Sequence, residues 1–202
     1  DSNGKILNAI AGALPSFIGG SADLGPSNKS ELDKMGCFPE GRNIHFGIRE
    51  HAMGAISNAL SLYGLFIPFS ATFFIFSDYM KPSVRLAALM KLQNFYIWTH
   101  DSIGVGEDGP THQPIEQLSQ FRALPNFYVY RPCDGAENVK AWKKALSMNA
   151  PAAFVLTRQK LRALKDDRAY GDVENGGYLL KKRDNATMTL MASGSEVFIA
   201  LQ

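Results

Sequence analysis

Residues 99–114, THDSIGVGEDGPTHQP, bring five titratable side chains into one glycine-rich stretch that is longer than most loops. These side chains belong to His100, Asp101, Glu107, Asp108 and His112. Histidines that titrate near neutral pH, next to carboxylates, suit proton transfer and hydrogen bonds to hydroxyl groups, so a polyol substrate is one interpretation. A metal site is the other, although the spacing of these residues matches no standard ligand pattern.

A second segment, GIREHAMG at residues 47–54, places Glu50 between Arg49 and His51, where a strand is expected to give way to a helix. The helix dipole favours an acidic residue in the first turn, so Glu50 is either a stabilising charge or a group that acts on a ligand. His51 likewise fits either a buried structural histidine or a functional one.

A third segment, ATFFIFSDYM at residues 71–80, repeats aromatic side chains every three to four residues: Phe73, Phe76 and Tyr79, with Met80 as an alternative to Tyr79. That spacing is typical of the buried face of a helix. The same side chains can stack on a flat heteroaromatic ring. The segment therefore predicts either core packing or a ring-binding pocket.

Two further segments carry groups that suit an anion. Glycines in GGSADLGPSN, residues 19–28, allow backbone amides to approach a phosphate closely, and Ser27 adds a hydroxyl donor near Asp23. A loop that only caps a helix is the alternative. In VLTRQK, Arg158 offers a bidentate fork to a phosphate, or is an exposed arginine without a special contact.

The elements that position these residues follow from an alternation of short apolar runs and helical patterns. We expect strands at residues 17–18, 44–46, 67–69, 95–98, 127–130 and 153–156. We expect helices at residues 6–14, 50–63, 77–91, 114–124 and 135–148. Strands separated by helices need crossover connections, so the fold class is α/β: a mainly parallel sheet of about six strands with helices on both faces. Ligands collect at the carboxyl ends of such strands, which is where the segments above lie.

This α/β domain is expected to span residues 1–165. A polar stretch at 165–170 predicts a linker. Residues 166–202 are interpreted as this linker and the truncated start of another α/β domain, with a strand at 188–191 and a helix start after Ser193. Because the chain begins at Asp1 and not at a methionine, upstream sequence is expected to be missing.

Composition narrows the class of protein. The 202 residues include 21 Lys+Arg and 19 Asp+Glu, and the net charge of +2 predicts no nucleic-acid partner. Cys37 and Cys133 lie far apart without a zinc-ligand spacing, which favours a reducing cytoplasm over a disulfide framework. The most apolar stretch, residues 65–76, is interrupted and too short to span a bilayer, so no membrane association is expected.

Taken together, GGSADLGPSN, GIREHAMG, ATFFIFSDYM, GEDGPTHQPIEQL and TRQ, in this order and at these separations, resemble the pyrimidine-binding domain of transketolases. Transketolases are thiamine-diphosphate enzymes. The resemblance covers residues 1–165, and the remainder is similar to the start of the transketolase C-terminal domain. The segment GEDGPTHQPIE is the most diagnostic, because related thiamine enzymes diverge there. The implied architecture is the thiamine-diphosphate-binding fold of the pyrimidine domain.

The resemblance implies a set of cofactor-binding residues. Glu50 is the carboxylate that hydrogen-bonds a ring nitrogen of the cofactor's aminopyrimidine and so helps to activate the cofactor. The aromatic pocket around that ring is formed by Phe73, Phe76 and Tyr79, and Asp23 lies close to the cofactor.

The resemblance also implies a substrate site. His112 is a catalytic residue beside the carbonyl and hydroxyl groups that exchange protons. Asp108 distinguishes hydroxyl stereochemistry, and His100 lies near the phosphate end of the substrate. The phosphate itself is bound by Ser27 and Arg158.

The implied reaction is the transfer of a two-carbon ketol unit from a ketose phosphate to an aldose phosphate, with thiamine diphosphate and Mg²⁺ as cofactors of the full-length enzyme. The family's diphosphate and metal-binding segment, a GDG motif followed by an asparagine, does not occur in this sequence. The metal and diphosphate ligands are therefore expected outside it, and no metal ligand is assigned here. In transketolases the cofactor lies between the subunits of a homodimer, so this chain alone is expected to be inactive.

Two other interpretations stay open. A different thiamine enzyme, such as dihydroxyacetone synthase, has a similar pyrimidine domain. The second is a non-catalytic module that only binds sugar phosphates, although such a module has no need of Glu50.

Overall fold

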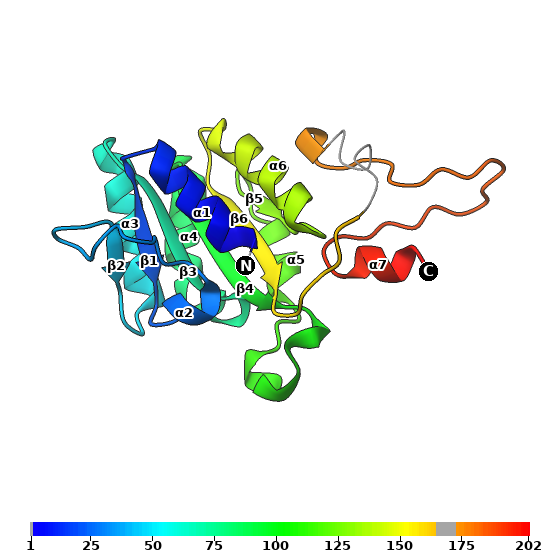
Figure 1. Cartoon of the computed structure of the whole chain (residues 1–202), viewed down its shortest axis with the longest axis horizontal. Coiled ribbons are helices and arrows are strands. Elements are labelled where there is room, and N and C mark those ends of the chain that lie inside the picture. The colour runs from blue at the N-terminus through cyan, green and yellow to red at the C-terminus, as the bar shows by residue number, and fades with distance from the viewer. Residues whose placement is uncertain (1, 165–172) are drawn as a thin grey trace.

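A six-stranded, all-parallel sheet forms the centre of the molecule in the computed structural model, which describes residues 2–164 and 173–202 (Figure 1). Its strand order is β2-β1-β3-β4-β6-β5. The strands are β1 (Phe17–Ser21), β2 (Asn43–His45), β3 (Ile67–Phe73), β4 (Phe95–Asp101), β5 (Tyr128–Tyr130) and β6 (Ala152–Thr157). All six predicted strands and the predicted α/β class are confirmed.

Helices connect the strands and cover the sheet. The α-helices are α1 (Ser2–Ala13), α2 (Gly25–Asn28), α3 (Glu50–Tyr63), α4 (Ser77–Met90), α5 (Gln117–Arg122), α6 (Gly135–Leu146) and α7 (Glu196–Ala200). Short 3₁₀ helices are η1 (Phe74–Phe76), η2 (Ile103–Asp108), η3 (Pro110–His112) and η5 (Val173–Asn175). The prediction of a helix from residue 114 was wrong at its start, because α5 begins only at Gln117.

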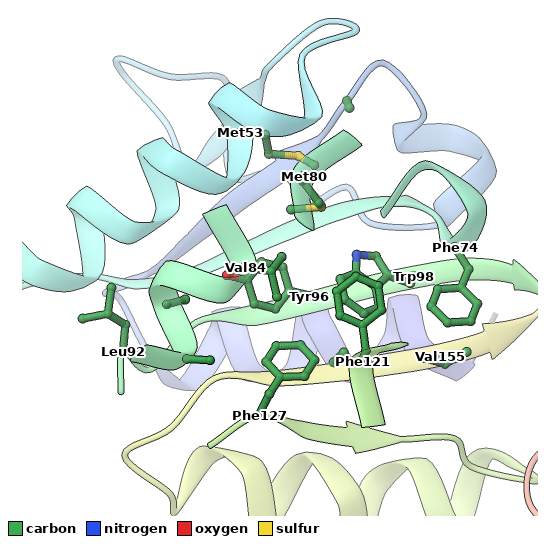
Figure 2. Packing of buried hydrophobic residues seen from close by; sticks show 14 of the residues in the cluster. Met53, Phe74, Met80, Val84, Leu92, Tyr96, Trp98, Phe121, Phe127 and Val155 are labelled. Atoms are coloured by element: carbon green, nitrogen blue, oxygen red, sulfur yellow. The ribbon is translucent and has the colours of Figure 1, made fainter. Parts of the chain in front are cut away.

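Two hydrophobic layers, one on each face of the sheet, follow from the alternation of side chains along each strand. On β4, Phe95 and Ile97 belong to the layer shared with α1 and α6, whereas Tyr96 and Trp98 belong to the layer shared with α3, α4 and α5. Figure 2 shows this second layer, in which the ring of Trp98 contacts those of Phe74 and Phe121. The prediction of helices on both faces is therefore confirmed.

Glycines let β1 lie close to both of its neighbours. A Cβ at Gly19 would overlap the carbonyl oxygen of Phe69, and one at Gly20 would overlap that of Ile44. Glycine therefore serves strand packing at these positions, while the part of the same segment that follows β1 is free to carry polar groups.

Residues 188–191 do not form the strand that the sequence predicts, whereas the helix start after Ser193 is confirmed by α7. A strand needs a partner to take up its backbone hydrogen bonds, and within residues 173–202 no segment pairs with this one as a strand. Its apolar side chains are accordingly exposed, Met191 by 94%. The predicted linker, residues 165–170, lies entirely outside the described ranges, so the domain boundary stays a prediction.

Candidate active site at the carboxyl edge of the sheet

The predicted site segments meet at one edge of the sheet because the strands are parallel. The chain passes from β1 outward to β2, then returns past β1 to β3 and continues outward to β4. The order therefore reverses between β1 and β3, and ligands of open α/β sheets bind in the crevice at such a point. The loop after β4 extends from this same edge, at the bottom of Figure 1.

Glu50 lies at this edge as the first residue of α3, which follows β2, and its side chain is buried: the residue is only 7% exposed. Arg49, its neighbour, turns away and donates a hydrogen bond to the carbonyl oxygen of Phe46 at 3.0 Å. Among the described residues, none donates a hydrogen bond or ion pair to the Glu50 carboxylate. Although the residue is largely buried, its carboxylate oxygens keep some exposure, so they can accept a hydrogen bond from a ligand at this edge. His51, by contrast, is exposed.

Five rings gather at the carboxyl ends of β3 and β4 and in the segments that follow them; we call them the aromatic cluster, and they belong to Phe73, Phe76, Tyr79, His100 and His112. Phe73 stacks on His100 with ring centroids 3.7 Å apart and on Phe76 at 5.8 Å. The edge of His112 meets Phe76 at 5.2 Å. Tyr79 stacks on the outer side of Phe76 at 6.0 Å and is 65% exposed. The predicted aromatic residues are thus in mutual contact at the edge, with Phe74 and Met80 in the core instead.

A β-bulge near the end of β4 sets the direction of His100. The pairing of β4 with β6 shifts register between Trp98 and Asp101, and His100 has φ of +60°, a left-handed conformation that non-glycine residues rarely adopt. Bulges re-aim side chains and are enriched beside active sites. At this bulge the His100 ring stacks on Phe73. Phe73 ends β3, where it pairs with Thr99 of β4.

The charge environment of His100 favours its neutral form. Burial lowers the pKa of His100, nearby Asp108 raises it, and Arg158 and His112 lower it further, so that the pKa is below its ordinary value. A neutral imidazole offers one nitrogen as a donor and the other as an acceptor.

Arg158 lies beyond the end of β6 and contacts the loop after β4. Its guanidinium is 2.5 Å from Glu107 and 3.5 Å from Asp108, and its side chain is 38% exposed. The structure therefore brings together Arg158, Asp108, His100 and His112, as predicted for a substrate site. Arg158 is exposed and pairs with acidic side chains of this loop, and its role as a phosphate-binding residue stays a prediction.

The segment after β1 contributes residues that are less tightly held. Asp23 is exposed with φ of +62°, and Ser27 is exposed within α2. No hydrogen bond or ion pair joins either residue to Glu50 or to the aromatic cluster. Their placement at the same edge follows from β1 alone, and their roles stay predictions.

A comparison with models of protein families identifies the family of this chain. The model of the family "Transketolase, pyrimidine binding domain" matches residues 1–163. This chain belongs to that family.

Its relatives are transketolases. The chain is 51% identical over 208 residues to a transketolase of Halalkalibacterium halodurans, covering 99% of this chain and 31% of the relative. A crystal structure of transketolase from Campylobacter jejuni is 68% identical, with a TM-score of 0.96, and this chain covers 32% of it. The chain therefore spans about a third of the length of the relatives it matches.

Two more solved structures of the transketolase family carry information about ligands and assembly. A transketolase from Pichia stipitis in complex with sedoheptulose-7-phosphate is 43% identical, with a TM-score of 0.93; the match covers 98% of this chain and 31% of that one. A split-gene transketolase, described as an inactive "beta4 tetramer" in the sense of its subunits, is 31% identical, with a TM-score of 0.68. The match covers 82% of this chain and 53% of that one.

Within this transketolase-family domain, the sequence reasoning missed three residues at the edge: Asn28, Thr99 and Arg131. Asn28 accepts a hydrogen bond from Thr99 at 2.6 Å, and Arg131 forms a 2.6 Å ion pair with Asp101. Thr99 and Asp101 flank His100, so their position beside a predicted site residue was a signal. Nothing local in the sequence pointed to Asn28 or Arg131 as their partners.

The residues present fit the ring of a transketolase cofactor better than its metal. Buried Glu50 without a protein donor and the stacked faces of Phe73 and Phe76 match a flat ring with a nitrogen. Across residues 2–164 and 173–202, no three His, Cys, Asp or Glu side chains come together as ligands of a metal ion. None of the helices in these ranges is long and apolar enough to cross a membrane.

Proposed function

We propose that the full-length protein that carries this chain transfers a two-carbon ketol unit from a ketose phosphate to an aldose phosphate, with thiamine diphosphate. One observation carries the proposal: the carboxylate of the largely buried Glu50, which has no protein donor among the described residues, lies at the same sheet edge as the aromatic cluster. Membership of the transketolase family supports it. Residues 1–202 alone are proposed to be inactive, since they span about a third of the relatives' length.

In this proposal the chain holds the pyrimidine ring of the cofactor. Glu50 accepts a hydrogen bond from a ring nitrogen, Phe73, Phe76 and Tyr79 surround the ring, and Asp23 lies near it. When bound, thiamine diphosphate supplies an electron sink for the two-carbon fragment. Mg²⁺ and the diphosphate group are held by residues outside this chain.

The substrate contacts follow the charges at the edge. Arg158 and Ser27 bind the sugar phosphate, Asp108 and His100 contact the sugar chain, and His112 exchanges protons with the reacting hydroxyl group. The arrangement of Arg158, Asp108 and His100 supports this assignment. The complex of the Pichia stipitis relative with sedoheptulose-7-phosphate supports the class of substrate.

A second copy of the full-length protein is the proposed partner, in a homodimer with the cofactor between subunits. Apolar side chains lie exposed on α3 and α4, among them Leu62 by 61% and Leu89 by 66%. Exposed apolar patches of this kind mark protein interfaces. The tetramer of the split-gene relative also supports assembly. We place the protein in the cytoplasm, in the pentose phosphate pathway, and its free thiols Cys37 and Cys133 agree with a reducing compartment.

Replacing Glu50 tests the function. In the full-length protein, Glu50→Gln should lower kcat for ketol transfer between xylulose and ribose phosphates by at least about 100-fold, the usual contribution of a positioned acid or base. The matched control is Glu40→Gln, which alters an exposed carboxylate in the turn that precedes β2 and should leave kcat unchanged. Near wild-type activity of Glu50→Gln would refute the proposal.

The same assays separate the alternatives. A full-length protein that binds sugar phosphates in calorimetric titration but never exchanges ketol units is a binding module. One that prefers other acceptors over aldose phosphates is a different thiamine enzyme, such as dihydroxyacetone synthase.

A further inference from the structure

We infer that Asn28 and Thr99 are positioning residues that hold His100 with its proton on Nδ1 and leave Nε2 as the ring atom open to a ligand. The inference rests on the proposed function only in taking a sugar phosphate as that ligand. Two contacts carry it, Asn28 to Thr99 and Thr99 to His100, and they join the segment after β1 to the end of β4.

The acceptor at the buried end of this chain of contacts assigns the donors. The Thr99 hydroxyl lies 2.6 Å from Oδ1 of Asn28, within the range of O–H···O hydrogen bonds, and the structure directs the amide oxygen of Asn28 at that hydroxyl. The amide oxygen of Asn28 can only accept, so the single hydroxyl proton of Thr99 points at it. The same hydroxyl lies 2.9 Å from Nδ1 of His100, which is the usual N–H···O separation. With its proton committed, the hydroxyl must accept there, and Nδ1 must donate.

Burial makes this assignment hold. Asn28 is 2% exposed and Thr99 is 7% exposed, so water does not compete freely for their polar atoms. The stacked ring of Phe73 covers His100 at 3.7 Å. Among the described residues, no hydrogen-bond partner contacts Nε2 of His100. That atom accepts a hydrogen bond from a hydroxyl while the ring is neutral, and donates one to a phosphate oxygen once the ring is protonated.

A second threonine–histidine pair, Thr111 and His112, has no counterpart of Asn28 among the described residues. The Thr111 hydroxyl also lies 2.9 Å from Nδ1 of His112, but Thr111 is exposed, and within residues 2–164 and 173–202 no buried acceptor fixes its proton. His112 can therefore exchange tautomers, whereas His100 is held in one. Because Asn28 directly follows Ser27, the hydrogen bonds from Asn28 through Thr99 to His100 also connect the proposed phosphate-binding segment to this histidine.

The protonation state of the two ring nitrogens tests the inference without any activity assay. In the full-length protein with ¹⁵N-labelled histidines, long-range proton–nitrogen spectra at about pH 8, above the ordinary pKa of histidine, distinguish protonated from bare nitrogens. The signals of His100 are those lost in His100→Gln. Wild type should show a protonated Nδ1 and a bare Nε2.

Variants then locate the cause. Thr99→Val should give a mixture of tautomers, Thr99→Ser should restore the wild-type signals, and Asn28→Asp should retain them because it keeps an acceptor. Thr111→Val is the control and should leave the His100 signals unchanged. A protonated Nε2 in wild type, or wild-type signals in Thr99→Val, would overturn the inference. If Thr99→Val does not fold, the wild-type spectrum and Asn28→Leu decide.

Kinetics add a second measurement. Loss of one oriented hydrogen bond should raise KM for the sugar phosphate about 3- to 10-fold in Thr99→Val, with a smaller change in kcat and recovery in Thr99→Ser. An unchanged KM would contradict the ligand-facing role. If the full-length protein lacks ketol transfer, the nitrogen spectra of His100 still test the hydrogen bonds from Asn28 through Thr99. The proposed function and this inference can therefore fail separately.

Discussion

Two arginines at the same edge of the sheet contact the segment 101–108 in opposite settings. Arg131, which follows β5, pairs with Asp101 at 2.6 Å, and both side chains are less than a tenth exposed. Arg158, which follows β6, pairs with Glu107 and Asp108, and its own side chain is 38% exposed. Both arginines pair with carboxylates, so pairing alone does not distinguish them. Burial does: the buried Arg131 stabilises the fold, whereas the exposed Arg158 remains accessible to a ligand.

Arg131 is the hub of a larger network. It donates to the carbonyl oxygen of Ser193 at 2.6 Å and forms an ion pair with Glu196, so it joins the end of β4 to α7. Burial lowers the pKa of Arg131, but hydrogen bonds to Glu196 and Asp101 and their charges raise it by more. The guanidinium is therefore charged in the folded protein at any physiological pH.

The largest effect should come from Arg131→Ala, which leaves Asp101 buried without its counter-charge. We expect a loss of about 3–5 kcal/mol in the free energy of unfolding, measured by denaturant or thermal unfolding of the full-length protein. The double variant Arg131→Met, Asp101→Leu removes both charges and should be less destabilised than the single variant. Equal losses in the two would show that the ion pair itself is not the cause.

Arg158→Ala should sharpen the contrast. Its exposed ion pairs contribute at most about 1 kcal/mol to stability, so the unfolding midpoint should barely move. Its proposed phosphate contact is charge-assisted, so KM for the sugar phosphate should rise about 10-fold, or about 1.4 kcal/mol, as measured by steady-state kinetics. A large fall in stability with an unchanged KM would place Arg158 in the same class as Arg131.

The smallest effect concerns Glu196 at the outer end of the Arg131 network. Burial raises its pKa, but hydrogen bonds from Arg131 and Ser195 and the charge of Arg131 outweigh this, so the pKa lies below its usual value of 4.5. A lowered pKa contributes stability above the unfolded-state pKa, and that stability is lost as the pH falls through the folded-state pKa.

Glu196→Gln should therefore be less stable than wild type by no more than about 1 kcal/mol near pH 7, since this side chain is 42% exposed. Thermal unfolding between about pH 7 and about pH 3 measures the difference, which should shrink below the usual glutamate pKa. A difference that grows on acidification would have the wrong sign for the assigned network.

Local patterns in the sequence were enough for the sheet and for most of the candidate site. Each strand of the sheet overlaps a short run that the sequence predicts as a strand, and α3 begins and ends where the pattern from Glu50 to Tyr63 indicates. Contacts between distant residues were not predictable. Thr99 and Asn28 are 71 residues apart, and Arg131 and Glu196 are 65 apart, so no local periodicity links them.

The bulge at His100 and the absent strand at 188–191 show the other limit. A left-handed conformation is uncommon for residues other than glycine, even though histidine adopts it more often than most, so the sequence alone did not predict it for His100 inside β4. The run 188–191 has the composition of a strand, yet strand formation needs a partner that this part of the chain does not supply within the described ranges.

The two tryptophans of this chain lie on opposite faces of the sheet, and each is almost fully buried. Trp142 donates its indole N–H to Asn3 at 3.0 Å, whereas the indole N–H of Trp98 has no partner among the described residues. Their emission spectra should differ because their polar surroundings differ. Replacing one at a time with phenylalanine would make the other an optical probe, so fluorescence can report separately on the loosening of each layer.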